Sequence, residues 1–140
     1  MAIAGAHGVA DVVVGADQAG NVTSSDSEAG QTWILYGPQR FGEVIDLADP
    51  PAEASVIYGA DFLDHTGSTV ACADVDGDGY MDVLSASYFD DKIAWYENDD
   101  SEGFTEHAIS TSADGAYDVY AADVDADGDM DVLSASQNEI

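Results

Sequence analysis

One block of sequence occurs twice in this chain, and this repeat constrains the fold more than any other feature. Residues 73–87 read ADVDGDGYMDVLSAS and residues 122–136 read ADVDADGDMDVLSAS, so the two copies lie 49 residues apart. A weaker echo near the start, DVVVGA at residues 11–16, aligns with residues 82–87. Repetition at such a period is typical of architectures that use one supersecondary unit several times.

Short strand-like segments alternate with turn-forming clusters inside the repeated unit. We expect strands at residues 69–73, 82–88, 92–97 and 104–109, with GDG, FDD and NDDSEG between them. No long stretch shows the 3.6-residue apolar period of a helix. Four short strands in a unit of about 40–50 residues are typical of a β-propeller blade, and a β-sandwich of similar strand density is the alternative. The repeat favours an all-β fold of four-stranded antiparallel blades.

The first half of the chain follows the same plan with longer connections. Its expected strands are residues 12–16, 32–36, 44–47 and 56–58, and a polar loop covers residues 18–30. We expect one propeller-like region over residues 1–140, with a first repeat at 1–66, a complete repeat at 67–114 and a partial repeat at 115–140. This amounts to about two and a half blades, whereas propellers have 4–8. Either a homo-oligomer completes the ring, or the chain is a fragment of a larger propeller.

The charge of the chain excludes several classes of partner. Asp and Glu number 29 against 2 Lys and Arg, which gives a formal net charge of −27. Such a polyanion repels phosphate backbones and anionic lipid head groups, so nucleic acid and membrane surfaces are poor partners. No run approaches the roughly 20 apolar residues of a membrane helix, and the first ten residues lack the pattern of a secretion signal. Cys72 is the only cysteine and is expected to be an inert core thiol.

Each copy of the repeat carries aspartates at positions 1, 3, 5 and 9 of a nine-residue loop, with glycine at position 6. Oxygen ligands at alternating positions suit Ca²⁺, and the backbone carbonyl at position 7 offers a further ligand. Without a cation the crowded carboxylates repel one another, so a plain acidic surface turn is the weaker interpretation. We predict two Ca²⁺ sites, with these ligands: Asp74, Asp76, Asp78, Tyr80 and Asp82 in the first loop, and Asp123, Asp125, Asp127, Asp129 and Asp131 in the second.

An EF-hand is excluded by two features of these loops. Its loop needs a bidentate Glu at position 12, where this chain has Ser85 and Ser134. The flanking residues, VACA before the first loop and VLSAS after it, are also strand-like rather than helical. We therefore expect each ion to lie in a β-hairpin and to be structural.

The residues quoted so far resemble a known family. Residues 67–87 resemble the FG-GAP repeat of integrin α-subunit propellers, and residues 82–136 are similar to VCBS/FG-GAP-like repeats of bacterial secreted proteins. Residues 11–19 with 29–37, DVVVGADQA and AGQTWILYG, look like a further unit. The resemblance implies a propeller with calcium in the hairpin between the first and second strands of a blade. In the first repeat only Gly8 and Asp11 of the loop pattern remain, so we expect no ion there.

Other candidate site residues have simpler interpretations. His65 and His107 could act in acid–base chemistry, but a packed or surface role is the stronger expectation, and no Gly-x-Ser-x-Gly elbow occurs. Trp33, Trp95 and Tyr96 are expected to pack between blades, with sugar stacking as the alternative. Asn21 begins an Asn-x-Thr glycosylation acceptor.

From these features we expect a binding protein rather than an enzyme. The leading expectation is a calcium-stabilised extracellular module for adhesion or for binding a protein or glycan ligand, because modest-affinity calcium sites suit the extracellular calcium concentration. One alternative is a fragment of a secreted polysaccharide-degrading enzyme, such as a propeller-fold lyase. Another is a purely structural spacer.

Overall fold

The computed structural model of the chain describes residues 2–4, 10–19, 29–37, 47, 54–59, 64–99 and 103–137. These residues form strands and turns and contain no helix, so none of them forms a helix able to cross a membrane. The ten strands are β1 (Ala2–Ala4), β2 (Ala10–Ala16), β3 (Gln31–Leu35), β4 (Ala54–Tyr58), β5 (Thr66–Ala73), β6 (Asp82–Ser87), β7 (Lys92–Asn98), β8 (Phe104–Ser110), β9 (Ala116–Ala122) and β10 (Asp131–Ser136). The expected all-β fold is confirmed.

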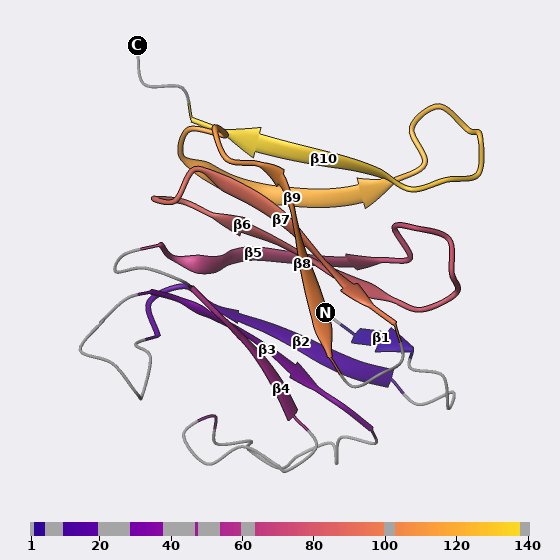
Figure 1. Ribbon diagram of the computed structural model, residues 1–140, viewed down its shortest axis with the longest axis horizontal. Coiled ribbons are helices and arrows are strands. Elements are labelled where there is room, and N and C mark those ends of the chain that lie inside the picture. Colours follow the sequence, from indigo (N-terminus) through magenta and orange to yellow (C-terminus); the bar gives the residue numbers. More distant parts are fainter. Residues whose placement is uncertain are drawn as a thin grey trace.

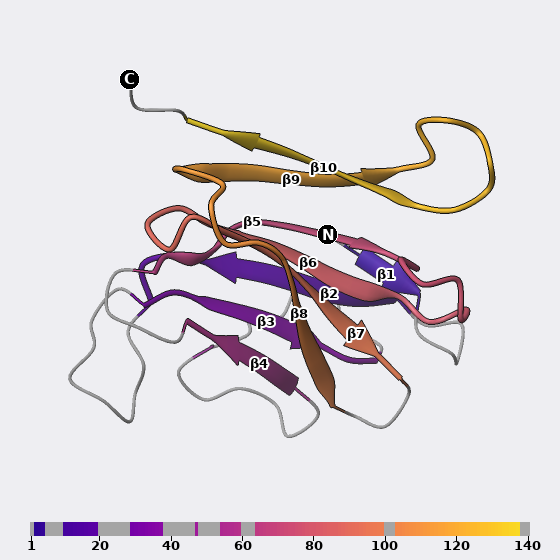
Figure 2. The same cartoon turned by 45° about the horizontal axis from the view of Figure 1, so that its top comes forward.

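The strands form three antiparallel sheets in which neighbours in sequence are neighbours in space. The first sheet has the order β1-β2-β3-β4, the second β5-β6-β7-β8, and the third contains only β9 and β10. Figures 1 and 2 show the sheets stacked face to face, with the β9–β10 pair uppermost. Two sheets of four strands and one of two agree with the expected two and a half units.

Strand β6 of the second sheet is buried on both faces. Successive side chains of a strand point to opposite faces. Val83 therefore joins a core cluster with Val13 and Ile34 of the first sheet, whereas Leu84 joins one with Val119 of the third sheet. Burying a side chain of this size stabilises the fold by about 1.5–3 kcal/mol. All six residues of β6 are buried, including the polar Asp82, Ser85 and Ser87, so neither face of this strand is exposed to solvent.

Glycines allow the first and second sheets to approach closely along their inner strands. A Cβ at Gly15 of β2 would collide with the carbonyl oxygen of Gly67 in β5. Gly67 itself has φ 84, and a Cβ there would lie 2.7 Å from the carbonyl oxygen of Gln31. At the equivalent junction between the second and third sheets, Ala86 and Ala116 are both fully buried. The first junction therefore has no room for a Cβ at positions where the second junction holds alanine.

Most of the expected strands are confirmed, with two differences in the first half of the chain. All four strands expected in the complete repeat, residues 67–114, are present. In the first repeat, the strands expected at residues 12–16, 32–36 and 56–58 fall in or beside β2, β3 and β4. No strand lies between β3 and β4, where the order of the chain would place the expected strand at 44–47, because β3 pairs directly with β4 from Gln31↔Tyr58 to Leu35↔Ala54. Leu47 lies in a turn, and residues 44–46 are outside the described part. The short strand β1 was not expected.

Candidate metal centre

The two aspartate loops occupy equivalent places at one end of their sheets. The first follows β5 and ends where β6 begins at Asp82, and the second follows β9 and ends at Asp131. Both loops project from the same side of the molecule, on the right in Figure 1. Each connects two antiparallel paired strands, so the expectation of a β-hairpin setting is confirmed.

Three carboxylates converge within each loop. Oxygens of Asp74, Asp76 and Asp78 lie within 4.8 Å of one another in the first loop, and those of Asp123, Asp125 and Asp131 do so in the second. The structure thus brings together three of the four predicted aspartates in each loop as a possible cation site. Asp76, Asp78 and all three members of the second group are exposed. The carbonyls of Tyr80 and Asp129 remain predicted ligands.

Backbone N–H groups fix the shape of both loops in the same way. The N–H of Gly79 donates to Asp74 Oδ2 at 3.0 Å, and that of Gly128 donates to Asp123 Oδ2 at 3.1 Å. Asp76 and Asp125 each accept from the N–H two residues later, at 3.1 and 3.2 Å. Such side chain–backbone bonds are the usual reason that aspartate favours turns. The repeated sequence therefore encodes a repeated local geometry.

The aspartate at position 9 has a structural role that the sequence reasoning missed. Asp82 is fully buried, and its two oxygens accept the N–H groups of Val75 and Asn98, both at 2.9 Å. Burial raises the pKa of the Asp82 carboxyl, and these two hydrogen bonds act in the opposite direction. Asp82 therefore ties the start of its loop to the end of β7.

Asp11 has the same role in the first repeat, where it is the only aspartate of the loop pattern. Asp11 is buried, and its Oδ1 accepts the N–H of Gly37 just after β3, at 2.8 Å. The presence of Asp11 at position 9, without the other aspartates, was the signal in the sequence that this position stabilises the fold independently of an ion. Residues 5–9 lie outside the described part of the chain, so the prediction of no ion there stays a prediction.

One atom of the first loop indicates that its residues fit a cation. Asp74 Oδ1 is buried and has no hydrogen-bond partner among the described residues. An unpaired buried carboxylate oxygen is unfavourable unless a positive charge compensates it. In the second loop the equivalent oxygen, Asp123 Oδ1, accepts the N–H of Asp127 at 3.2 Å. The donor set is entirely oxygen, which suits Ca²⁺.

The other candidate residues of the sequence lie outside these loops. Trp33 and Tyr96 are buried, which confirms their packing role, and Trp95 stacks on His107 at a centroid distance of 4.5 Å. His107 Nε2 also contacts Glu97 Oε2 at 2.6 Å. Burial raises the pKa of the Cys72 thiol to about 12, as expected for an unreactive core cysteine. Asn21 lies outside the described residues.

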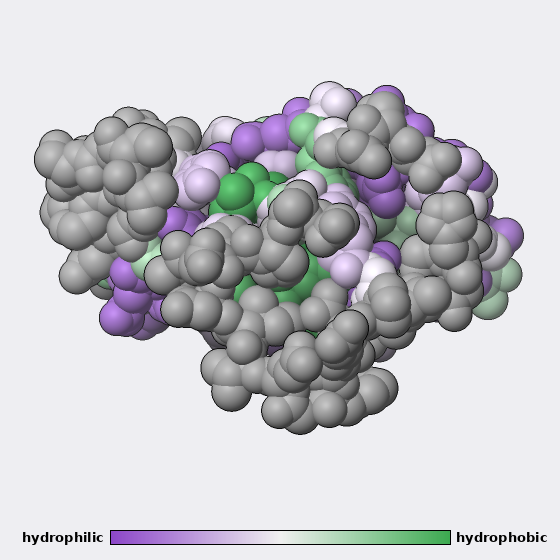
Figure 3. Space-filling model, turned by 90° about the horizontal axis from the view of Figure 1, so that it is seen from below, coloured by the Kyte–Doolittle hydropathy of each residue, from purple (hydrophilic) through white to green (hydrophobic). Residues whose placement is uncertain are grey.

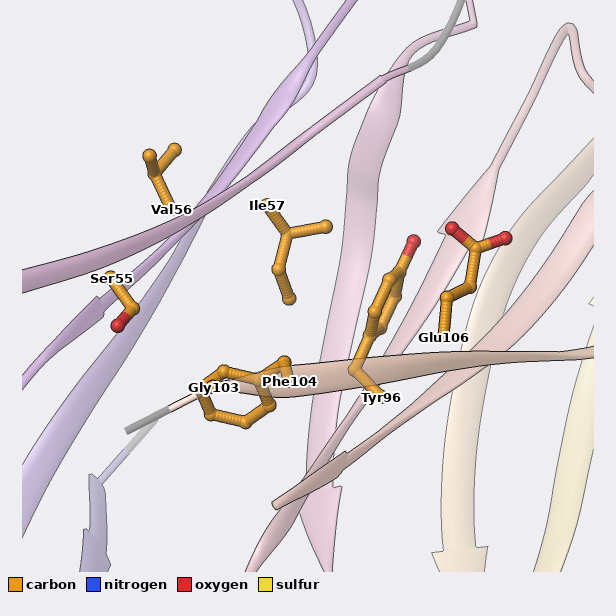
Figure 4. A pocket seen from close by; sticks show the side chains of 7 residues that line it. All are labelled: Ser55, Val56, Ile57, Tyr96, Gly103, Phe104 and Glu106. Atoms are coloured by element: carbon orange, nitrogen blue, oxygen red, sulfur yellow. The ribbon is translucent and has the colours of Figure 1, made fainter. Parts of the chain in front are cut away.

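A separate pocket of about 380 Å³ lies between the outer strands of the first and second sheets. It is lined by Ser55, Val56 and Ile57 of β4 and by Tyr96, Gly103, Phe104 and Glu106 on or beside β7 and β8 (Figure 4). Figure 3 shows apolar surface between hydrophilic flanks on the face seen from below. The mixed lining suits a small, partly apolar group.

Part of the chain matches a known family model. Residues 74–134 match the family model described as an FG-GAP-like repeat. The match begins at the first aspartate of the first loop and ends within β10, so it includes both aspartate loops. Comparison with curated proteins and with solved structures gives no significant match. Residues 74–134 are thus similar to an FG-GAP-like repeat, which implies β-propeller blades, and the four-stranded antiparallel sheet β5–β8 agrees with this similarity.

Proposed function

We propose that this chain is part of a calcium-stabilised β-propeller that acts outside the cell as an adhesion or ligand-binding module, without catalytic activity. The observation that carries the calcium half of the proposal is the buried, unpartnered Asp74 Oδ1 beside the carboxylates of Asp76 and Asp78. A bound Ca²⁺ would compensate this oxygen and relieve the repulsion within the loop. Since the loop joins β5 to β6, the ion would also hold these strands together.

The end of the sheets opposite the aspartate loops supports a binding role. Phe89, in the turn between β6 and β7, is 60% exposed. Edge contacts hold its ring against Tyr88 and His65, at centroid distances of 4.7 and 4.8 Å. An exposed ring kept in a fixed position is a suitable platform for the apolar face of a sugar or for a protein side chain.

The backbone beneath Phe89 is also fixed by its neighbours. Asp91, at the end of the same turn, accepts the N–H of Gly115 on Oδ1 at 2.9 Å and the N–H of Ala113 on its carbonyl oxygen at 2.8 Å. Asp91 and His65 both have positive φ values, 52 and 55, although neither is glycine. Strained backbone of this kind is often found at functional sites.

Removing the metal tests the proposal that bound Ca²⁺ stabilises the fold. Isothermal titration should show two Ca²⁺ per chain, and a chelator should lower the free energy of unfolding by about 3 kcal/mol for a site saturated at 100 times its Kd. The corresponding fall in melting temperature is on the order of 10 °C. An unchanged melting curve after chelation would contradict a structural ion.

The binding half is tested on a glycan array and with candidate matrix proteins in calcium buffer. Phe89→Ala should reduce binding about tenfold or more, because a stacked ring contributes on the order of 1–2 kcal/mol. Tyr58→Ala is the matched control, since Tyr58 is also exposed (41%) but lies on β4. Unchanged binding in Phe89→Ala would locate the ligand away from the Phe89 turn.

A further inference from the structure

The pocket between the first and second sheets has no part in the proposals above. It lies where the core between these two sheets ends. Inside, Val13, Ile34 and Tyr96 belong to one cluster of buried residues. Toward the outer strands β4 and β8, Ile57 and Phe104 pack against this cluster but are only partly buried, and both line the pocket of about 380 Å³. Its volume is in the range of small-molecule sites.

The hydroxyl of Tyr96 is available to a group that enters this pocket. Tyr96 is only 4% exposed, and its ring brings the hydroxyl to the pocket (Figure 4). No residue that the structure describes forms a hydrogen bond with this hydroxyl. At the β4 side of the pocket, by contrast, the hydroxyl of Tyr36 donates to Ser55 Oγ at 3.1 Å. A ligand atom that pairs with the Tyr96 oxygen therefore gains a hydrogen bond in surroundings of low dielectric constant.

The charges around this hydroxyl are mostly negative. Burial raises the pKa of Tyr96 to about 12, so the hydroxyl keeps its proton near neutral pH. Three carboxylates act in the same direction as burial, and only the ammonium of Lys92 acts against them. The carboxylates belong to Glu106, Asp90 and Asp64. The hydroxyl therefore lies in a field that favours a positive charge beside it.

The only lysine of the chain does not neutralise this border of the pocket. Lys92 Nζ lies 3.2 Å from Glu106 Oε1 and 3.2 Å from Asp90 Oδ2, so one positive charge faces two carboxylates. Glu106 is directly opposite Tyr96 in the pairing of β7 with β8, and its side chain is 47% exposed. Opposite side chains of an antiparallel pair lie on the same face of the sheet. The pocket thus attracts cations and repels anions.

We propose that this pocket binds a small organic amine, with a primary ammonium group on a short aromatic body. The ammonium would donate to the Tyr96 oxygen and to the Glu106 carboxylate. The body would lie against Ile57 and Phe104, where it removes apolar surface from water. The ring of Phe104 adds a face that attracts the positive charge. This inference depends neither on the calcium sites nor on the ligand proposed for the Phe89 turn.

Three probes of similar size test the proposal on the full chain in calcium buffer at about 0.15 M salt. They are 2-phenylethylamine, a cation, 2-phenylethanol, which is neutral, and phenylacetate, an anion. Binding is followed by NMR titration of the backbone amides. We expect 2-phenylethylamine to bind with a Kd on the order of 1 mM or below and to shift amides of β4, β7 and β8. 2-Phenylethanol should bind at least about tenfold more weakly, and phenylacetate should not bind.

Variants of the chain separate the pocket from the general attraction of a polyanion for cations. Tyr96→Phe removes the hydroxyl and keeps the ring, and Glu106→Gln removes the charge and keeps the shape. Each should weaken 2-phenylethylamine about fivefold or more. Asp118→Asn is the matched control, because it removes the same charge from an exposed position on β9, away from the pocket, and should leave the Kd unchanged. The probe series in the unmodified chain needs no variant to fold.

Several results would overturn the proposal. Equal affinities for the three probes would show that the pocket does not select a cation. Shifts confined to amides outside β4, β7 and β8 would place the amine elsewhere. Equal weakening in Asp118→Asn and Glu106→Gln would show that total charge alone attracts it. Tighter binding of Nα-acetyl-lysine amide than of 2-phenylethylamine would identify a lysine side chain of a protein as the occupant.

Discussion

The hairpins β5–β6 and β9–β10 share nearly the same loop and the same second strand, yet they differ in their surroundings. Their loops share local hydrogen bonds whose distances agree within about 0.1 Å at each equivalent bond, and the second loop has one more, from the N–H of Asp127 to Asp123 Oδ1. Asp82 is nevertheless fully buried, whereas Asp131 is exposed. The comparison shows that nine residues determine the shape of the loop, and that a neighbouring strand determines the environment of its last aspartate.

The largest expected effect comes from removing that aspartate from each hairpin. Asp82→Ala leaves the N–H groups of Val75 and Asn98 without an acceptor, so we expect a loss of about 3 kcal/mol in unfolding free energy. Asp131→Ala removes one bond near solvent and should cost about 1 kcal/mol. Urea unfolding in the presence of a chelator measures both without a contribution from metal binding.

A second variant separates shape from charge at the same position. Asp82→Asn keeps the size of the side chain and one oxygen acceptor, so its loss should lie between those of the two alanine variants. Equal losses for Asp82→Ala and Asp131→Ala would contradict the claim that β7 sets the environment of Asp82.

The sequence predicted the shared part of these hairpins because that part is local. Aspartates that bond to the backbone within five residues, and glycine at position 6, produce a loop whose form depends little on the rest of the fold. The strands of the second unit were predictable for a similar reason, since turn-forming clusters separate them. The double role of Asp82 was not predictable, because Asn98 lies 16 residues away and reaches it only through the pairing of β6 with β7.

The first half of the chain also has features that the sequence could not predict, because they depend on tertiary contacts. Residues 44–47 have the apolar character of a strand, but β4 already occupies the place beside β3. Local propensity cannot decide which of two apolar segments pairs with a given strand, because the choice depends on tertiary contacts. The close junction between Gly15 and Gly67 likewise depends on how two sheets meet, and sequence spacing alone does not reveal it.

β7 is the neighbour that pairs with β6 and has no counterpart beside β10 among the described strands. A buried tyrosine on β7 makes the stability of this part of the fold dependent on alkaline pH. Burial raises the pKa of Tyr96, on β7, to about 12 from its ordinary value of 10.0. The unfolded chain therefore loses the Tyr96 proton first as pH rises. The stabilisation is fully present below pH 10 and is lost between pH 10 and 12, by an amount on the order of 2 kcal/mol.

The alkaline loss should be smaller in variants without these buried protons. Tyr96→Phe should reduce the fall in unfolding free energy above pH 10, measured in urea at several pH values. Cys72, whose pKa is also raised to about 12, contributes between pH 9 and 12, so the Tyr96→Phe, Cys72→Ala double variant should be flatter still. An unchanged pH profile in Tyr96→Phe would show that its hydroxyl ionises as readily in the folded state as in the unfolded one.

The smallest expected effect concerns position 4 of the loops, one of the two places where the repeated blocks differ. Gly77 has φ 77 and Ala126 has φ 63, a region that alanine adopts with strain. A Cβ added at Gly77 would meet no atom within 4 Å, so any penalty there comes from the backbone alone. We expect Gly77→Ala to destabilise the chain by about 1 kcal/mol and Ala126→Gly to stabilise it by a similar or smaller amount, because glycine also gains freedom in the unfolded state. Paired urea unfolding curves measure both, and effects of the same sign would show that the two loops differ in backbone shape as well as in surroundings.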